Sequence, residues 1–436
     1  MTASGAKPAW MQDLCRRGLE RFKQVGYPSN KLEEWRQTNV APIAKTNFIA
    51  AQPNPDVSER DIRPFSFRDE ASVELVFVNG YFAPPLSDLS SVPAGLRVAS
   101  LASLFQRDSK RLEAHLGRYA LVDANPFAAL NTGNLNDGAV VFLDRAVIAE
   151  RPIHLLFLSA GSKSPMVSHP RVLVVASDNV DATIVETYAG IGGGTYFTNA
   201  VSEIVIGNYA RIDHCRLQHE TLDAFHVSTT RAQVGRSSTF VTQSAALGSR
   251  MTRNDLNVVL SGEGAEATLN GLVLANGNQH VDNHTLLDHA APNCASHELY
   301  KHVLGDSATG VFRGKILVRQ TAQKTDSKQT SRSLLLSDDA DMNSQPALEI
   351  YADDVKCTHG STTGPVDDEM VFYLRSRGVS LEAARSLLIY AFAADITRRI
   401  QVEPVRRQLE NHMAAQHDLP QDLRITDLGR YDEKHR

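Results

Sequence analysis

The sequence predicts a mainly β protein in which a β-solenoid core lies between helical N-terminal and C-terminal regions. Short β-prone runs separated by Gly, Asn, Asp and Ser continue for more than 200 residues, from about Asp137 to Thr363. Small residues after such turn clusters lie 28, 28, 27, 43 and 32 residues apart, at Ala182, Ala210, Ser238, Ala265, Ala308 and Ala340. This periodicity indicates coils that bury their inward residues by stacking on one another. A β-sandwich is the alternative, but it needs a shorter stretch of alternation.

Residues 1–136 are predicted to form a mainly helical N-terminal region. The stretch from about Pro8 to Phe48 reads as helical with a break at Gly26, and Trp35 is expected to anchor a short helix on a neighbouring element. From Val73, the run VELVFVNGYF predicts a strand that ends in an Asn79-Gly80 hairpin turn. Residues 101–131 are expected to be helical again.

The core is expected over residues 137–364 and a C-terminal helical region over residues 365–436. Three acidic residues at 367–369 suit a helix N-terminus, and Gly378 suits its end. Ser380 then has the position of an N-cap for a helix over 381–400. The centre of this helix, LLIYAFAA, is apolar nearly all round, which predicts burial in its own domain or against a partner.

Composition and charge argue against several classes of protein. The 436 residues carry a formal net charge of -5 without a basic patch, so we expect no nucleic-acid partner. No apolar run approaches the roughly 20 residues that span a bilayer, and the N-terminus lacks a signal-peptide pattern, so we expect a cytoplasmic protein without membrane attachment. The four cysteines are far apart and predict free thiols: Cys15, Cys215, Cys294 and Cys357.

Two catalytic motifs are missing. The glycine run at Gly192-Gly193-Gly194 is not followed by Gly-Lys-Ser/Thr, so a turn is a better interpretation than a phosphate cradle. We therefore expect this chain to bind no nucleotide and to hydrolyse no ATP. No G-x-S-x-G elbow supports a serine nucleophile.

The stretch ALEIYADDVKCTHGSTTG contains the strongest candidate site. A β-type run ends there in Cys357 and His359, which would project from one face of a strand together with Val355. Cysteine and histidine are soft-metal ligands, so this geometry suits a shared ligand site. A single pair is a weak signal, however, and a buried structural cysteine beside a hydrogen-bonded histidine explains the same residues.

Two further sets of residues are candidates for a site. His280, Asp282 and His284 have the strand spacing of a two-histidine, one-carboxylate metal set, but a polar ladder along a solenoid gives the same spacing. A polysaccharide lyase or hydrolase would need clustered carboxylates, for which the candidates are solvated turn residues: Asp338, Asp339, Asp353 and Asp354.

Four segments resemble the SufB/SufD family of iron–sulfur cluster assembly proteins, and its SufD branch most closely. They are KLEEWRQTNVAPI, FVNGYFAPPLSDLS, the block from GKILVRQ to CTHGSTTG, and DDEMVFYLRSRGVSLEAARSLLIYAF. The SufB pattern has a cysteine where this chain has Ala340 and a glutamate where it has Gly360. The SufD pattern Cys-x-His-Gly is present as residues 357–360.

The resemblance implies a right-handed parallel β-helix and a non-catalytic subunit of a SufBCD-type complex. It implies pairing with SufB through the β-helix and binding of the SufC ATPase through the C-terminal helices, for which we expect the helix at 381–400 to be the docking region. It also implies that His359, with Cys357 beside it, helps to hold a nascent iron–sulfur cluster shared with SufB. The alternatives are a SufB-like homodimeric scaffold and a β-helix lyase or hydrolase; the isolated chain could also form a homodimer.

Overall fold

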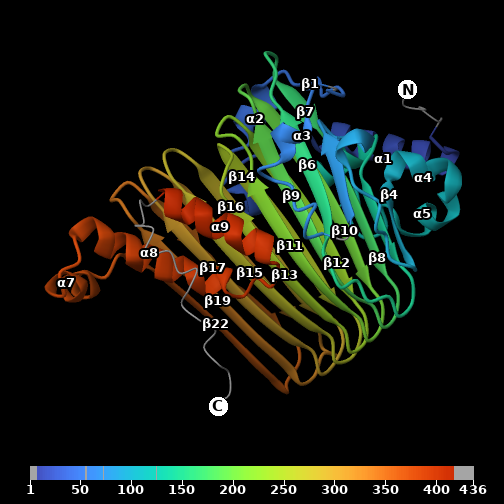
Figure 1. Cartoon of the computed structure of the whole chain (residues 1–436). Coiled ribbons are helices and arrows are strands. Elements are labelled where there is room, and N and C mark those ends of the chain that lie inside the picture. The colour runs from blue at the N-terminus through green and yellow to red at the C-terminus, as the bar shows by residue number, and fades with distance from the viewer. Residues whose placement is uncertain (1–6, 55, 72, 124, 417–436) are drawn as a thin grey trace.

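The structure is a computed structural model that describes residues 7–54, 56–71, 73–123 and 125–416. Two long sheets enclose a central core, and helices cover parts of their outer faces (Figure 1). The predicted mainly β fold with a solenoid core and helical ends is confirmed. No helix within the described ranges is long and apolar enough to cross a membrane.

The first wall of the solenoid is a twelve-stranded sheet. Its strands are β1 (Ile49–Ala50), β4 (Leu96–Ser100), β5 (Ala139–Leu143), β7 (Met166–Ser168), β8 (Arg171–Ala176), β10 (Tyr196–Ile206), β12 (Phe225–Val234), β14 (Met251–Leu260), β16 (His280–His289), β18 (Thr309–Val318), β20 (Asp341–Ser344) and β21 (Ala347–Ile350).

The second wall is a ten-stranded sheet. Its strands are β2 (Val73–Val78), β3 (Tyr81–Phe82), β6 (Ile153–Ala160), β9 (Asp181–Ile191), β11 (Arg211–His219), β13 (Thr239–Ala246), β15 (Glu266–Ala275), β17 (Ala295–Leu304), β19 (Thr325–Leu335) and β22 (Val355–Pro365). Strands pair in parallel in both sheets except at β2–β3 and β4–β5. From β8 to β20 successive strands alternate between the sheets, so each coil in this part contributes one strand to each wall.

Turns with left-handed residues connect the two walls. Asn179, Tyr209, Ser237 and Asn293 have positive φ where the chain passes from the twelve-stranded to the ten-stranded sheet. The first four small residues of the sequence repeat follow turns on this side, whereas Ala308 and Ala340 follow turns on the opposite side. The repeat therefore breaks at the 43-residue gap because it mixes two kinds of turn.

The sheets also include residues upstream of the predicted start of the core. β1 pairs with β7, β2 with β6, and β4 with β5, so the ten-stranded wall begins at Val73 and the twelve-stranded wall already includes Ile49–Ala50. The expected hairpin is present: β2 and β3 pair antiparallel around Asn79 and Gly80, both of which have positive φ. The division into three domains stays a prediction.

The helices of the N-terminal region lie against the first coils. They are α1 (Ala9–Val25), α2 (Ala41–Lys45), α3 (Glu59–Ile62), α4 (Leu101–Arg107), α5 (Ser109–His115) and α6 (Pro126–Gly133), with short 3-10 helices η1 (Glu33–Trp35) and η2 (Pro84–Leu86). Trp35 is the anchor that the sequence predicts. It is 3% exposed and packs among buried residues that include Phe127 and Met251.

The C-terminal region contains α7 (Asp368–Ser376), α8 (Leu381–Thr397) and α9 (Glu403–Gln416). Ser380 caps α8 as expected, because its side chain accepts a hydrogen bond from the backbone N–H of Ala383. α8 and α9 lie over the outer face of β13, β15 and β17 (Figure 1). Ile389, Ala393 and other residues of α8 are buried there, so the apolar centre of this helix packs within its own chain.

Candidate functional site

The last strand of the ten-stranded sheet, β22, carries the candidate pair. It pairs in parallel with β19 on one side, and no other strand of the described residues pairs with its second edge. Most of its residues are exposed to solvent. An exposed strand edge offers unpaired N–H and C=O groups to another chain. This end of the solenoid is therefore open to a partner.

Cys357 and His359 lie on the face of β22 that continues the interior of the solenoid. Their partners in register are Ser327 and Gln329, which are buried inward-facing residues of β19. Cys357 is half-buried and packs against the central core, and His359 is exposed. Further along, Ser361 donates a hydrogen bond to Ser344 across the interior, at 2.9 Å. The strand alternation that the sequence predicts for the pair is thus present.

The environment of Cys357 disfavours its thiolate form. Burial, followed by the charge of Asp326, raises the pKa of the Cys357 thiol. The thiolate is the form that binds metals, so this thiol is a poor ligand until a cation or a partner changes its surroundings. The exposed imidazole of His359 is the more accessible of the two donors.

A buried carboxyl group lies two strands behind His359. Glu298, Gln329 and His359 are consecutive partners in register on β17, β19 and β22. The Gln329 amide Nε2 donates a hydrogen bond to Glu298 Oε2 at 2.7 Å, and Gln329 Oε1 has no partner within the described ranges. Burial raises the pKa of Glu298 to about 7.

Other inward polar atoms near this end also lack partners among the described residues. Both ring nitrogens of His302 and the hydroxyl oxygens of Ser331 and Ser333 are buried in this way. Because buried polar groups are nearly always hydrogen-bonded, these atoms indicate internal water in the last coils. The signal in the sequence is the alternation of TDSKQTSRS, in which every second residue from Thr325 to Ser333 is both polar and buried.

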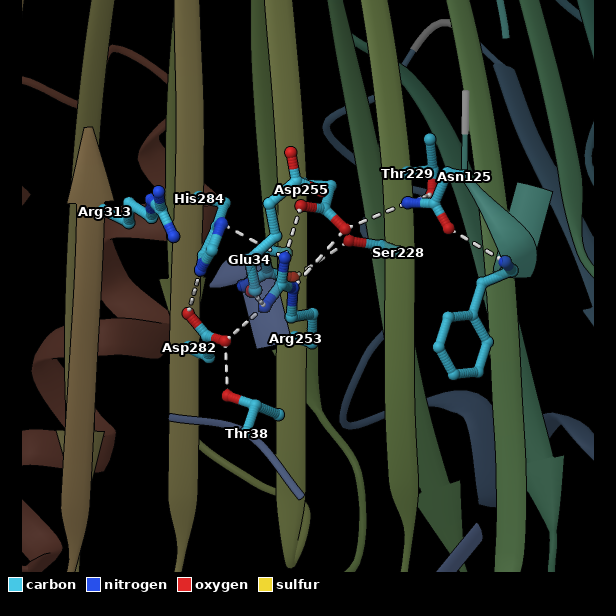
Figure 2. A network of polar contacts seen from close by, with 12 residues as sticks. Glu34, Thr38, Asn125, Ser228, Thr229, Arg253, Asp255, Asp282, His284 and Arg313 are labelled. Carbon is cyan, nitrogen blue, oxygen red and sulfur yellow. Dashed lines mark hydrogen bonds and ion pairs between the residues drawn. The ribbon is translucent and has the colours of Figure 1, made fainter. Parts of the chain in front are cut away.

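The second candidate set, His280, Asp282 and His284, does share one face of β16, but its atoms are used in other contacts. Figure 2 shows Asp282 and His284 beside Arg253 and Thr38. Asp282 Oδ2 is 2.7 Å from Arg253 Nη1 and also accepts a hydrogen bond from Thr38. Asp282 Oδ1 is 3.0 Å from His284 Nε2.

His280 Nε2 is 2.8 Å from Thr38 Oγ1, so the set attaches the N-terminal segment to the outer face of the twelve-stranded sheet. Burial alone would raise the pKa of Asp282. The positive charges of Arg253 and His284 outweigh this effect and hold the pKa of Asp282 well below its usual range. These three residues form polar contacts, as the alternative interpretation of their spacing expects, because the Arg253 guanidinium lies where a metal cation would have to bind. Nowhere in the described ranges do three or more His, Cys, Asp or Glu residues form a group that could hold a metal ion.

The acidic candidates for a lyase or hydrolase do not meet. Asp338 and Asp339 are exposed in the turn that follows β19, and Asp353 and Asp354 are exposed in the turn that precedes β22. Because β19 and β22 run parallel, these turns lie at opposite ends of strands that are 11 residues long. At about 3.3 Å per residue, the two pairs are too far apart to act on one glycosidic bond.

Comparisons with known proteins agree with this architecture. Residues 157–392 match the family model described as the SufBD core domain of SUF-system FeS cluster assembly, and residues 4–155 match the SufBD N-terminal region. An iron-sulfur cluster assembly SufBD family protein of Synechocystis is 35% identical over 392 residues, which cover 88% of this chain and 86% of that protein. The iron-sulfur cluster assembly protein SufD of Escherichia coli is 30% identical, with 90% and 89% covered. SufD of Bacillus subtilis is 25% identical, with 92% and 93% covered.

Proposed function

This chain belongs to the SufBD family of iron–sulfur cluster assembly proteins, and we propose that it acts as a SufD-like, non-catalytic scaffold subunit of a SufBCD-type complex. In this proposal the open end of the solenoid pairs with SufB, and the C-terminal helices bind the SufC ATPase. A nascent cluster then forms at the SufB/SufD interface, where it is the cargo of the complex. ATP hydrolysis belongs to SufC.

The observation that carries the proposal is the position of His359 on an exposed terminal strand. The side chain faces the same way as the buried residues of the coil behind it, yet nothing in the described ranges covers it. A second solenoid that continued the sheet from β22 would enclose His359 between two subunits. The same edge explains how the isolated chain could form a homodimer.

The number of ligands supports a site shared between subunits. His359 and Cys357 supply two donors, whereas a stable cluster needs about four protein ligands. Their side chains lie at the edge, so the remaining thiolates would come from the partner. An imidazole ligand also needs its second nitrogen held by a hydrogen bond, and Gln329 Oε1 is an unused acceptor at the neighbouring position in register.

The decisive experiment compares cluster formation by anaerobically reconstituted complexes that contain wild type or His359→Ala. We expect the variant to assemble normally and to lower the affinity for the nascent cluster by about tenfold or more, since a direct ligand matters at least as much as the groups that orient it. Cys357→Ser should have a smaller effect, because burial disfavours its thiolate.

Thr358→Ala is the matched control, because Thr358 alternates with the pair and points to the opposite side of β22. Cluster yield is measured by absorbance and iron content, and assembly by size-exclusion chromatography. Normal cluster formation by an intact His359→Ala complex would contradict the proposal and would mean that Cys357 and His359 have only a structural role.

The exposed apolar side chains of the C-terminal region lie on α7. Met370, Phe372 and Tyr373 are 52%, 75% and 55% exposed, and Figure 1 shows α7 projecting away from the sheets. Exposed aromatic clusters of this kind are typical of protein interfaces. Because the centre of α8 is covered by its own sheet and α9, we assign the principal contact with SufC to α7.

Phe372→Ser should therefore weaken SufC binding without changing the fold. Truncation of a central interface aromatic costs about 2 kcal/mol or more, which is roughly 30-fold in Kd. The control is Leu222→Ser, since Leu222 is 65% exposed in a turn between β11 and β12. Binding is measured by calorimetry with the purified ATPase. Equal affinities for both variants would exclude α7 as the docking helix.

A further inference from the structure

A basic cleft lies on the outer face of the ten-stranded sheet, beside the C-terminal half of α8. Its volume is about 290 Å³, and β15, β17, β19 and α8 form its walls. Lys328 and Arg332 reach it from β19, and Arg399 reaches it from the residues after α8. His297 adds an imidazole from β17. The cleft is on the side of the sheet opposite to the candidate pair, and it is separate from α7.

Positive charge in the cleft exceeds negative charge. Two acidic residues line the cleft, Glu298 and Asp395. The Glu298 side chain points to the solenoid interior, where it accepts a hydrogen bond from Gln329, and Asp395 already has two cationic partners. Its Oδ2 is 2.9 Å from Lys301 Nζ, and its Oδ1 is 3.2 Å from Arg399 Nη2. Lys328 and Arg332 make no ion pair within the described ranges. The excess is local, because the whole chain has a formal net charge of -5.

The arrangement of these charges costs stability in the absence of an anion. Lys301 and Arg332 are direct partners in register on β17 and β19, and like charges at opposed positions of a sheet repel each other. Lys301 is nearly buried and is neutralised by Asp395. Arg332 has no carboxylate of its own, so a negative ligand in the cleft would remove this repulsion.

A buried amide also faces the cleft. Asn270 on β15 is 3% exposed, lines the cleft, and makes no side-chain hydrogen bond within the described ranges. Its neighbour in register, Gln243, has a buried Oε1 without a partner there. Because polar side chains inside folded proteins are nearly always hydrogen-bonded, a ligand or water in the cleft is the natural partner of the Asn270 amide.

We propose that this cleft binds a small molecule that carries two or more phosphate or carboxylate groups. The guanidinium group of Arg332 provides a planar donor pair that matches either kind of group. Arg399 already donates to Asp395 through Nε and Nη2, so it adds its positive charge and the free Nη1. Lys328 adds a third charge, and Asn270 adds a neutral donor and acceptor. The volume suits a ligand near the lower limit of small-molecule sites, and it is too small for a folded partner.

Binding at this place would join two parts of the chain. Arg332 and Lys328 belong to the coil next to β22, and Arg399 belongs to the C-terminal helices. A bridging anion would hold these helices against the last coils. The proposal depends on the cleft alone and stands whether or not His359 binds a cluster.

The test is isothermal titration calorimetry of the full-length chain at low ionic strength, with inorganic pyrophosphate and with citrate as separate probes. We expect wild type to bind at least one probe, and Arg332→Gln and Lys328→Gln each to weaken that binding by about tenfold, the size expected when a charge-assisted hydrogen bond is lost. Arg250→Gln is the matched control and should bind as wild type does, since Arg250 is an exposed arginine between β13 and β14 and does not line the cleft.

Binding of pyrophosphate alone would identify a phosphate ligand, and binding of citrate alone a carboxylate ligand. The proposal is overturned if wild type binds neither probe, or if both cleft variants bind as tightly as the control. Circular dichroism confirms folding of each variant. Because Lys328 is exposed and unpaired in the described ranges, its variant keeps the test valid if Arg332→Gln fails to fold.

Discussion

Replacement of Arg253 by leucine is expected to lower the free energy of unfolding by about 3–5 kcal/mol at neutral pH. Arg253 is buried on the outer face of β14, between Asp255 and Asp282 (Figure 2). Its Nη1 is 2.7 Å from Asp282 Oδ2, and its Nη2 is 3.1 Å from Asp255 Oδ1. The substitution leaves two buried carboxylates without their cation, which costs more than the loss of the contacts themselves.

The same side chain also holds the N-terminal segment. The Arg253 guanidinium lies 3.9 Å from the centre of the Trp35 ring, and its Nη1 donates a hydrogen bond to the Glu34 carbonyl at 2.8 Å. We expect this segment to be cleaved earlier by a protease in the variant. The loss of stability should shrink as the pH falls towards about 4, because carboxyl groups without a cation take up protons near or above their ordinary pKa.

Arg313→Leu is the matched control for this prediction. Arg313 contacts the same segment through the carboxylate of Glu33 at 2.6 Å, but Glu33 is largely exposed. A pair of this kind contributes less than about 1 kcal/mol. Urea unfolding monitored by circular dichroism distinguishes the two variants. An equal decrease in the free energy of unfolding of both variants would mean that the buried contacts of Arg253 contribute no more to stability than an exposed ion pair.

The sequence predicts most of the architecture because its signals are local. Alternating short strands separated by turn residues predict the solenoid, and Asn79-Gly80 predicts the hairpin. Ser380 and the apolar centre of the following helix likewise report α8 and its burial. Each of these signals depends on residues within one element or one turn.

Contacts between distant coils could not be predicted in the same way. The spacing of His280, Asp282 and His284 predicts that they share one face of a strand. The groups that contact this face come from Arg253 and from a segment more than 200 residues upstream, and the spacing does not predict them. The spacing shows that a cation could bind at this face, but it does not show which one. The cation is the guanidinium of Arg253, which lies on the neighbouring strand β14. The sequence contains no local signal that pairs these residues.

The candidate site likewise has features that the sequence predicts and features that depend on distant strands. The alternation of Cys357 and His359 is visible in the sequence, whereas the exposure of β22 depends on its being the last strand of the sheet. The ladder from Glu298 through Gln329 to His359 depends on strand register, which relates residues about 30 positions apart. Its buried carboxyl group leads to the second large effect.

Glu298→Gln is expected to stabilise the protein at alkaline pH relative to wild type. Burial raises the pKa of Glu298 from 4.5 to about 7 in the folded chain. Between these two values the folded state binds more protons than the unfolded state, so the stability that the protonated carboxyl group provides is lost as the pH rises from about 4.5 to 7. The loss amounts to about 3 kcal/mol, because each pKa unit corresponds to about 1.4 kcal/mol.

Glutamine cannot ionise, and its amide oxygen can still accept the hydrogen bond from Gln329. The stability of Glu298→Gln relative to wild type should therefore rise by about 3 kcal/mol between pH 4 and pH 8, as measured by urea unfolding at each pH. Glu266→Gln makes the same substitution at an exposed position of the neighbouring β15, and its stability relative to wild type should not follow this curve. A difference between Glu298→Gln and wild type that stays constant with pH would show that Glu298 ionises normally inside the solenoid, with enough internal water to solvate its charge beside Gln329 and His359.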